Sequence, residues 1–407
     1  MPVLTRWSLT WTAWRVRDFR WFWLGHILHV GGSWMQIVSL SWMAYRLTDS
    51  AFVLGLIYFL SLLPVGLVSL IGGVISDRLP PRKLVQGTQV VLVVQALVLA
   101  WLAWTGAVRL WHIMLMTLVV GAADAFEQPA RYVISFRLVG QEGLSNAIGL
   151  CSLAEGVARS VSPALAGALI RWQGETCSFM VSSAAYLLAG LAFSALPLLK
   201  AQPAGRPTSF QADLLDAPRH LWHSKTARGL LLLLAASCLF AQPYVILMPV
   251  WARDVLQIDA RGYGLLMSAV GAGTACGALL AASIPPGKRG RWLIGSGLVS
   301  CAVLILATVS HWLPLSAGLV LLAGTGQSVQ LVLTSSLLQL VTRSDLHGRV
   351  ASLYALLNNG LTRLGGVQAG LVASQSGAPV AVAGGALLCI PWSLVVAWQE
   401  PTIRNLE

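Results

Sequence analysis

Long apolar stretches separated by short polar segments run through the whole chain. A helix needs about 20 mostly apolar residues to cross the hydrocarbon core of a bilayer. Twelve stretches approach or exceed that length, at roughly 20–45, 52–76, 84–105, 110–132, 144–170, 178–199, 228–250, 261–284, 292–310, 315–339, 349–374 and 378–398. Strands of a transmembrane β-barrel would instead alternate over about 10 residues. The pattern therefore predicts an all-α integral membrane protein with twelve transmembrane helices.

One long polar segment, residues 200–227, separates the first six predicted spans from the last six. It is rich in Pro, Arg and His, and we interpret it as a cytoplasmic linker between two domains. The expected organisation is an N-terminal segment (1–18), a six-helix bundle (19–199), this linker, a second six-helix bundle (228–398) and a tail (399–407).

A weak internal repeat relates the two halves at a shift of about 204 residues. It pairs Gly73 with Gly277 and Arg159 with Arg363. A repeat of this kind predicts two pseudo-symmetric bundles around a cavity near the midplane of the membrane.

The charge is sparse and unevenly placed. Hydrophobic residues make up 56% of the chain and charged residues 10%, against about 25% charged residues in a soluble domain. The net charge is +12, and most of the 27 Lys and Arg fall in the tails and in loops on the side of the N-terminus. Five face the other side, namely Arg46, Arg109, Arg171, Arg253 and Arg261. Because Lys and Arg accumulate in cytoplasmic loops, we expect both termini in the cytoplasm and no nucleic-acid partner.

The N-terminal segment carries aromatic residues at helical spacing. Residues 1–18 lack the apolar core of a signal peptide. Trp7, Trp11 and Trp14 share one helical face, with Arg6 and Arg15 nearby. This pattern predicts an amphipathic helix on the cytoplasmic leaflet. A disordered tail with interfacial tryptophans is the alternative.

The loop between the second and third predicted spans resembles the signature loop of the major facilitator superfamily, Gly-x-x-x-Asp-Arg-x-Gly-Arg-Arg. The matching residues are Gly73, Asp77, Arg78, Arg82 and Lys83. Pro80 and Pro81 stand where Gly and Arg are usual, which stiffens the turn and removes one positive charge. The resemblance implies a secondary transporter built from two six-helix bundles, in a bacterial inner membrane.

Other segments are similar to one exporter branch of that superfamily, which includes siderophore and drug efflux proteins. They are residues 128–131, 144–148, 158–167 and 347–354. Within the third of these, Pro163 bends the fifth helix, while Ala164 and Gly167 allow close packing. This segment looks like a degenerate form of the superfamily's antiporter motif, which implies export.

The resemblance also implies a conformational latch. The signature Asp, here Asp77, is expected to face the start of helix 11 near Gly348 and Arg349. Exposed N–H groups and the helix dipole favour an anion there. Such a contact would join the halves when the cytoplasmic side is closed, and would bias the conformational equilibrium rather than bind substrate.

Five charges lie inside the predicted spans and away from their ends: Asp124, Glu127, Glu155, Arg159 and Arg363. A charge at the bilayer centre costs about 2.5–3.5 kcal/mol on insertion scales, so each needs a partner or a watery cavity. Glu155 can pair with Arg159, and Glu127 with Arg131, because residues four apart share a helical face. Both pairs could fasten helices together, or they could belong to a functional charge network.

Asp124 is the first candidate for proton coupling. It lies seven residues from Arg131, on a helix that lines the cavity in this superfamily. A carboxylate in a partly dry cavity can exchange protons near neutral pH. Alternatively, Asp124 and Glu127 join Asp77, Arg78 and Arg131 in a network that latches the outward-open state. We favour this second role for Glu127.

For the substrate, the resemblance points to helices 1, 4, 7 and 10. Their polar and aromatic residues are His26, His29, Trp34, Gln36, Gln242, Tyr244, Gln327 and Gln330. Rings and amides suit a large amphipathic molecule that carries rings and carbonyl groups. His26 and His29 could also titrate or be packed as neutral rings. No metal-binding spacing accompanies them, and the six cysteines form no disulfide pattern.

The sequence carries no phosphate-binding lysine loop and no nucleophile with its base, so we expect neither an enzyme nor a cofactor. We expect a monomeric transporter embedded in lipid, which exchanges protons for a siderophore of the catecholate or carboxylate kind. Broad drug efflux and flipping of a lysophospholipid are alternatives. A non-transporting sensor or scaffold is a further class, against which the charges in the spans count.

Overall fold

The fold was obtained as a computed structural model, which describes residues 13–64, 79–198, 224–342, 346–400 and 402–403. All regular secondary structure in these residues is helical. By their contacts the residues form two compact units: residues 1–47 with 60–205, and residues 48–59 with 206–407. We call them unit 1 and unit 2 and describe each by itself.

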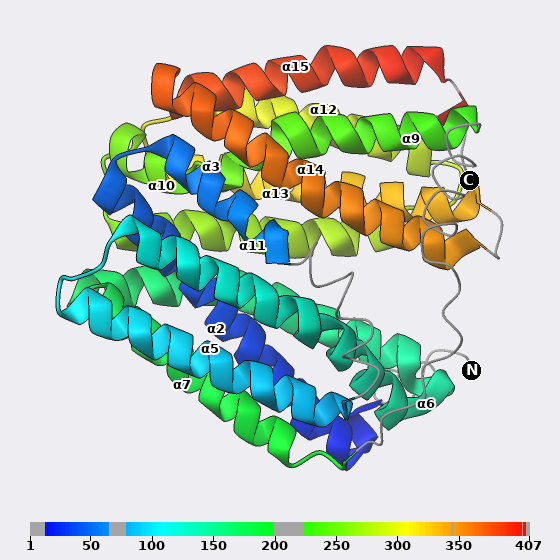
Figure 1. Ribbon diagram of the computed structural model, residues 1–407. Coiled ribbons are helices and arrows are strands. Elements are labelled where there is room, and N and C mark those ends of the chain that lie inside the picture. The colour runs from blue at the N-terminus through cyan, green and yellow to red at the C-terminus, as the bar shows by residue number, and fades with distance from the viewer. Residues whose placement is uncertain (1–12, 65–78, 199–223, 343–345, 401, 404–407) are drawn as a thin grey trace. The chain divides into compact units, whose positions relative to one another are not determined.

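Unit 1 contains η1 (Ala13–Arg15), α2 (Arg17–Thr48), α5 (Pro81–Trp104), α6 (Leu110–Gln173) and α7 (Glu175–Ser194). Helix α5 packs along α7 and also contacts α6 (Figure 1). The aromatic rings of Phe19, Phe22 and Phe193 fill the core near the start of α2. This end of the unit is therefore held together by apolar packing between α2 and α7.

Helix α6 holds the fourth and fifth predicted spans as one element of 64 residues with a break at Gly140. Gly140 has φ 67° and ψ −174°, a conformation that is open to glycine but strained for other residues. The chain turns there, so residues on the two halves of α6 can face each other. This turn is what brings the charges of the two predicted spans into one region.

Polar contacts tie α7 to its neighbours at both of its ends. The guanidinium of Arg82 donates to the backbone carbonyls of Ser194 and Leu196. These carbonyls lie at the end of α7, where no further helical N–H group is available to them. At the other end, Arg46 Nε lies 3.0 Å from Glu175 Oε1. These contacts fix the lengthwise position of α7 against α2 and α5.

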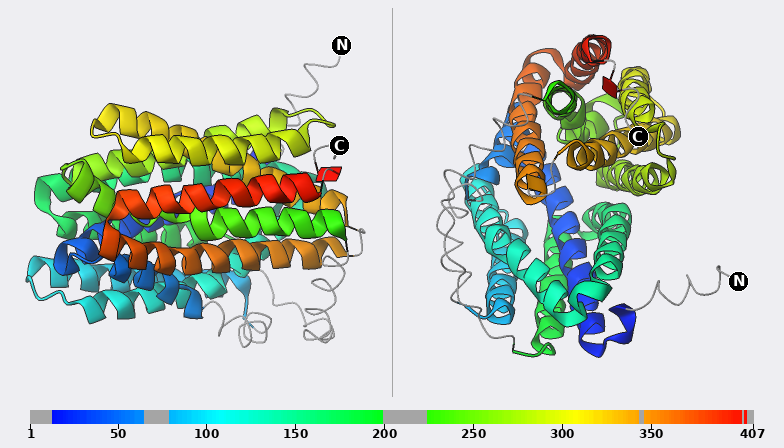
Figure 2. Two further views of the ribbon diagram at one scale, coloured as in Figure 1. Left: turned by 90° about the horizontal axis from the view of Figure 1, so that it is seen from above. Right: turned by 90° about the vertical axis from the view of Figure 1, so that its right-hand side faces the viewer.

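Unit 2 contains α3 (Ala51–Leu60), α9 (Lys225–Ala236), α11 (Ala260–Ser283), α12 (Arg289–Thr308), α13 (Leu313–Leu340), α14 (His347–Ser376) and α15 (Ala378–Gln399). Helices α9, α14 and α15 lie side by side (Figure 2). Helix α3 belongs to this unit because it packs closely on α14: a methyl group at Gly55 would meet the backbone of Gly366.

The seventh predicted span, described over residues 225–255, is not a regular helix. After α9 come a π-helical turn η2 (Ser237–Ala241), a 3-10 turn η3 (Gln242–Val245), a short α10 (Met248–Val250) and a second π turn η4 (Trp251–Val255). Pro243 and Pro249 lack the N–H that a regular helix requires, which accounts for the irregular backbone between them. The π turn η2 is covered by glycines, since a methyl at Gly365 or Gly385 would meet its carbonyl groups.

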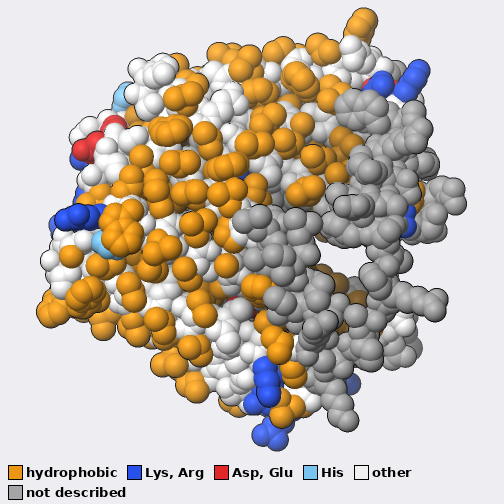
Figure 3. All heavy atoms as spheres, viewed as in Figure 1, with side chains coloured by type: hydrophobic (Ala, Val, Ile, Leu, Met, Phe, Trp, Pro, Cys, Tyr) orange, Lys and Arg blue, Asp and Glu red, His pale blue; other side chains and the backbone are white. Residues whose placement is uncertain are grey.

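The predicted twelve-span fold is confirmed. Eight helices among the described residues are long and apolar enough to cross a membrane. The other four predicted spans correspond to α2, to α3 with residues 61–64, to the second half of α6 and to α14. Large apolar side chains cover much of the face drawn in Figure 3. Large apolar residues of the described chain are widely exposed, for example Leu279, which is 75% exposed. Such an apolar surface suits contact with lipid tails.

Candidate functional site

Unit 1 contains a buried carboxyl group, that of Glu127 on α6, which contacts side chains from α2 and α5. Its side chain is fully buried. Thr88 Oγ1 donates to Oε2 at 2.8 Å, and Gln89 Nε2 donates to Oε1 at 2.8 Å, both from α5. Neutral donors thus bind both oxygens. This is the arrangement expected for a carboxyl group that must exist out of water.

The imidazole of His29, from α2, is the next neighbour of Glu127. His29 Nδ1 lies 3.2 Å from Glu127 Oε1 and 2.9 Å from Gln89 Nε2. Two lone pairs at 3.2 Å repel, so the contact between Nδ1 and Oε1 is favourable only when a proton lies on one of the two atoms. The pair can therefore hold a proton in the dry interior of unit 1.

Arg131 lies between this buried pair and the surface of a pocket. Its Nε is 3.7 Å from Glu127 Oε1, one helical turn away. Its Nη1 is 3.4 Å from His26 Nδ1. An arginine can only donate, so His26 Nδ1 accepts and the ring proton is assigned to Nε2.

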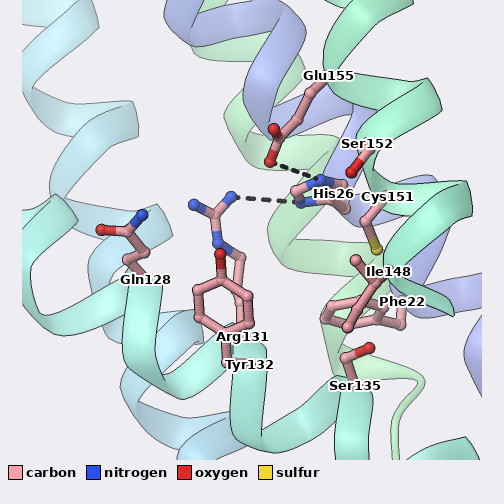
Figure 4. Close-up of a pocket in the computed structure, with 10 residues that line it drawn as sticks. All are labelled: Phe22, His26, Gln128, Arg131, Tyr132, Ser135, Ile148, Cys151, Ser152 and Glu155. Atoms are coloured by element: carbon pink, nitrogen blue, oxygen red, sulfur yellow. Dashed lines mark hydrogen bonds and ion pairs between the residues drawn. The ribbon is translucent and has the colours of Figure 1, made fainter. Parts of the chain in front are cut away.

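The row of charged and titratable groups ends at Glu155, on the second half of α6. His26 Nε2 lies 3.6 Å from Glu155 Oε1, and the Glu155 side chain is 59% exposed. Figure 4 shows Arg131, His26 and Glu155 in sequence, joined by dashed lines. From Glu127 to Glu155 the groups thus lead from a buried carboxyl to an accessible one.

The expected pair of Glu155 with Arg159 is not what the structure contains. Glu155 contacts His26, whereas the Arg159 guanidinium lies 4.8 Å above the ring of Trp34. The spacing places both residues on one face of α6, but each side chain turns towards a partner on α2. Trp34, expected in the substrate cavity, is therefore the cation–π partner of Arg159.

Asp124, the first candidate for proton coupling, is half-buried and precedes Glu127 by three residues. Glu127, for which the sequence favoured a latch, is the fully buried carboxyl of the two. Gly73, Asp77 and Arg78 lie outside the described residues, so the latch stays a prediction. Of the other residues assigned to it, Arg82 caps α7, Lys83 is exposed and Arg349 is half-buried near the start of α14.

Gln36 is a helix-fastening residue in the structure. Its Nε2 donates to Gln95 Oε1 at 2.6 Å, and its Oε1 accepts from Tyr186 Oη at 2.9 Å. All three side chains are buried. Gln36 therefore joins α2 to α5 and α7 rather than presenting an open amide to a substrate.

Of the four residues of unit 2 that the sequence assigned to the substrate cavity, three are buried among other side chains. Gln327 Nε2 donates to the carbonyl of Ala241 in the π turn at 3.1 Å, and Gln330 and Tyr244 are buried. Gln242 is half-buried and accepts from Thr362 Oγ1 at 3.1 Å. Of the four, Gln242 is the one with part of its surface exposed.

A pocket of about 110 Å³ opens beside Arg131 and Glu155 (Figure 4). Its lining residues are Phe22, His26, Gln128, Arg131, Tyr132, Ser135, Ile148, Cys151, Ser152 and Glu155. The described residues contain no group of three metal-binding side chains.

Sequence reasoning missed Thr88 and Gln89, which hold Glu127, and Ser135 and Tyr132 in the pocket. A signal for the first two was present, because polar residues recur in an otherwise apolar third span at Gln86, Thr88, Gln89 and Gln95. In a lipid environment such residues are expected to face protein partners.

The chain matches the family model described as transmembrane secretion effector over residues 8–403. It is 28% identical over 351 residues to the enterobactin exporter EntS of Salmonella typhi, covering 83% of each protein. It is 26% identical over 162 residues to a staphyloferrin A transporter of Staphylococcus aureus (39% of this chain, 41% of that protein). Macrolide efflux protein A of Streptococcus pyogenes is 24% identical over 156 residues, 38% of each chain.

Among solved structures, the chain resembles an inward-facing bacterial homologue of the human lysosomal transporter Spinster. The TM-score is 0.77 at 14% identity, over 95% of this chain and 98% of the other. A likeness at this identity establishes the fold alone. With the family match, it shows that the chain belongs to the transmembrane secretion effector family of the major facilitator superfamily: it is a multi-pass membrane transporter of small molecules and not an enzyme.

Proposed function

We propose that the protein exports a siderophore, or a similarly amphipathic small molecule, across a bacterial inner membrane in exchange for protons. The family and its exporter relatives support the direction of transport. The distribution of Lys and Arg supports cytoplasmic termini. Alternating access of two bundles around a central site would move the substrate.

The observation that carries proton coupling is the contact of Glu127 with His29. The two groups are fully or almost fully buried and 3.2 Å apart. An ionised pair at this depth is costly to strand without its partner, while a shared proton makes the contact favourable. A transporter can use such a group if the proton reaches it in one conformation and leaves it in another.

Arg131 and His26 supply a link from Glu127 to the pocket. Arg131 contacts Glu127 on one side and His26 on the other, and His26 contacts Glu155. A change of charge at Glu127 would alter the electrostatic energy of an ionised Glu155 through these two side chains. Proton binding in the interior and ligand binding in the pocket are thereby coupled.

The test is transport in proteoliposomes loaded with a panel of radiolabelled iron-free catecholate and carboxylate siderophores. A pH gradient should drive uphill transport of at least one of them. Glu127→Gln keeps the size of the side chain and should abolish pH-driven accumulation while sparing downhill exchange. Asp124→Asn, the change at the carboxyl first chosen from the sequence, is the matched comparison.

If Asp124→Asn abolishes accumulation and Glu127→Gln retains it, the coupling group is Asp124 and our assignment to Glu127 is wrong. If no siderophore is transported but macrolides are, the substrate assignment is wrong. Macrolide efflux is the second candidate function, which the similarity to macrolide efflux protein A supports.

A further inference from the structure

The pocket of unit 1 presents buried polar atoms that have no hydrogen-bond partner. His26 is 5% exposed and Ser135 is 6% exposed. Ser135 Oγ makes no hydrogen bond, and His26 Nε2 has only the long 3.6 Å contact with Glu155, although both residues line the pocket. Burying a hydroxyl or a ring nitrogen without a partner is unfavourable. Two such atoms in one hollow indicate a place where a ligand supplies the missing partners.

The pocket also has a donor end and an acceptor end. Arg131 offers guanidinium N–H groups, of which one makes a long hydrogen bond to His26. Glu155 offers carboxylate oxygens, and its side chain is mostly exposed. In Figure 4, the Arg131 and Glu155 side chains both extend towards His26 from different parts of α6. A ligand that contacts both residues must carry an acceptor for Arg131 and a donor for Glu155.

Another part of the pocket wall is apolar, beside the polar side chains of Gln128 and Ser152. It is formed by the ring of Phe22 with Ile148 and Cys151, and the ring of Tyr132 lies beside Arg131 (Figure 4). Aromatic rings pack favourably against other rings. Because Arg131 and Glu155 carry opposite charges, the lining has little net charge, which favours a neutral ring over a highly charged ligand.

We propose that this pocket is a binding subsite for an aromatic ring that bears a hydroxyl next to a carbonyl group. The carbonyl accepts from Arg131, the hydroxyl donates to Glu155, and the ring packs on Phe22. The proposal rests on the proposed function, because it identifies the part of the exported molecule that unit 1 recognises.

This geometry explains how a ligand and a proton would compete. A phenolic hydroxyl donates to an ionised Glu155 and gains much less from a protonated one. Facing Glu155 are His26 from α2 and Arg131 from the first half of α6, with Arg159 and Cys151 on its own half of α6. The ligand therefore leaves when Glu155 takes up a proton, as an exchanger requires.

The test is binding of salicylamide to the purified full-length protein in lipid nanodiscs, measured by calorimetry at several pH values. Salicylamide carries the ring, the hydroxyl and the carbonyl. 2-Methoxybenzamide lacks the hydroxyl donor, and benzylamine carries a cation instead. We expect salicylamide to bind about tenfold more tightly than 2-methoxybenzamide, and its affinity to fall as the pH is lowered.

The variants Glu155→Gln and Ser135→Ala distinguish the contribution of the Glu155 acceptor to binding from that of another pocket residue. Glu155→Gln should weaken salicylamide binding about tenfold and remove its pH dependence, while Ser135→Ala should weaken binding less. Glu175→Gln is the matched control. It makes the same charge change at the start of α7, where the carboxylate pairs with Arg46, and should leave binding unchanged.

The subsite is refuted if salicylamide does not bind, if it binds no better than 2-methoxybenzamide, or if Glu155→Gln has no effect. Preferred binding of benzylamine would show a cation site instead. These outcomes leave proton-coupled export standing, because that is tested separately by Glu127→Gln in proteoliposomes. Absence of pH-driven export by the unaltered protein, together with normal salicylamide binding, would instead overturn the proposed function and spare the subsite.

Discussion

The interiors of the two units are built from different chemistry. In unit 1, titratable and charged side chains from α2 and α6 approach one another between Glu127 and Glu155. In the described spans of unit 2, Arg363 is the one charged residue away from the ends of a helix. The polar contacts there are made by amides and hydroxyls, such as Gln242 with Thr362, around an irregular backbone.

Both units contain an arginine that lies over an aromatic ring. Arg159 in unit 1 lies 4.8 Å above Trp34, and Arg363 in unit 2 lies 5.9 Å above Tyr58. These are the two arginines that the sequence repeat pairs at a shift of about 204 residues. An intramembrane arginine over a ring is thus repeated, while the carboxyl groups are not.

The repeated fold can therefore support a different task in each unit. The carboxyl and imidazole groups of unit 1 can take up protons, whereas the amides and hydroxyls of unit 2 cannot near neutral pH. The π turn of unit 2 is the kind of irregularity that often marks a functional site. We expect changes in unit 1 to affect coupling, and changes in unit 2 to affect stability or ligand affinity.

The largest effect is expected for Arg131→Leu in unit 1. Removing the cation leaves the negative charge of the buried Glu127 carboxylate without its arginine partner. Breaking a buried ion pair in this way costs up to about 3–5 kcal/mol. Folded yield in the membrane, measured by fluorescence-detected size exclusion, should fall, and coupled export should be lost. The double variant with Glu127→Gln should recover the yield but not the export. Normal yield and export in the single variant would remove Arg131 from the coupling network.

The next largest effect is expected for Gly385→Ala in unit 2. The new methyl would meet the carbonyl of Phe240 in the π turn, and overpacking of this kind costs about 1–3 kcal/mol. The melting temperature of the purified protein should fall. Gly384→Ala is the matched control, because no atom lies within 4 Å of a methyl group placed there. Equal melting temperatures for the two variants would argue against close packing at the π turn.

A smaller effect is expected for Thr362→Val, which removes the hydroxyl that donates to Gln242 and nearly keeps the shape of the side chain. Loss of one neutral hydrogen bond is worth about 0.5–1.5 kcal/mol. The concentration of substrate at half-maximal transport should change severalfold at most, with the ratio of protons to substrate unchanged. A changed ratio would contradict the division of tasks between the units.

The smallest effects are expected at the two repeated arginine contacts. Trp34→Leu in unit 1 and Tyr58→Leu in unit 2 each remove a ring below a guanidinium. A contact of this kind contributes about 0.5–1 kcal/mol at exposed sites. Thermal stability should fall slightly and by a similar amount in both variants. A large loss of export in only one of them would mean that the arginine of that unit has a role beyond packing.

The sequence alone determined the twelve spans and the transporter fold. Its apolar stretches differ from the helices by a few residues at most of their described ends. The prediction succeeds because lipid tails cannot form hydrogen bonds with exposed backbone N–H and C=O groups. Each spanning segment must therefore be an apolar helix by itself. The signature loop and the exporter-like segments added the superfamily, which the comparisons confirm.

Only the tertiary structure decided which charges meet. Helical spacing placed Glu155 and Arg159 on one face, but it could not reveal that His26 and Trp34 of α2 are their partners. The polar residues of the third span indicated protein partners, but not that Thr88 of α5 binds Glu127. Residues on different helices meet through the turn at Gly140 and the packing of α2 and α5 on α6. Those arrangements depend on the side chains of several helices at once, which no single stretch of sequence contains.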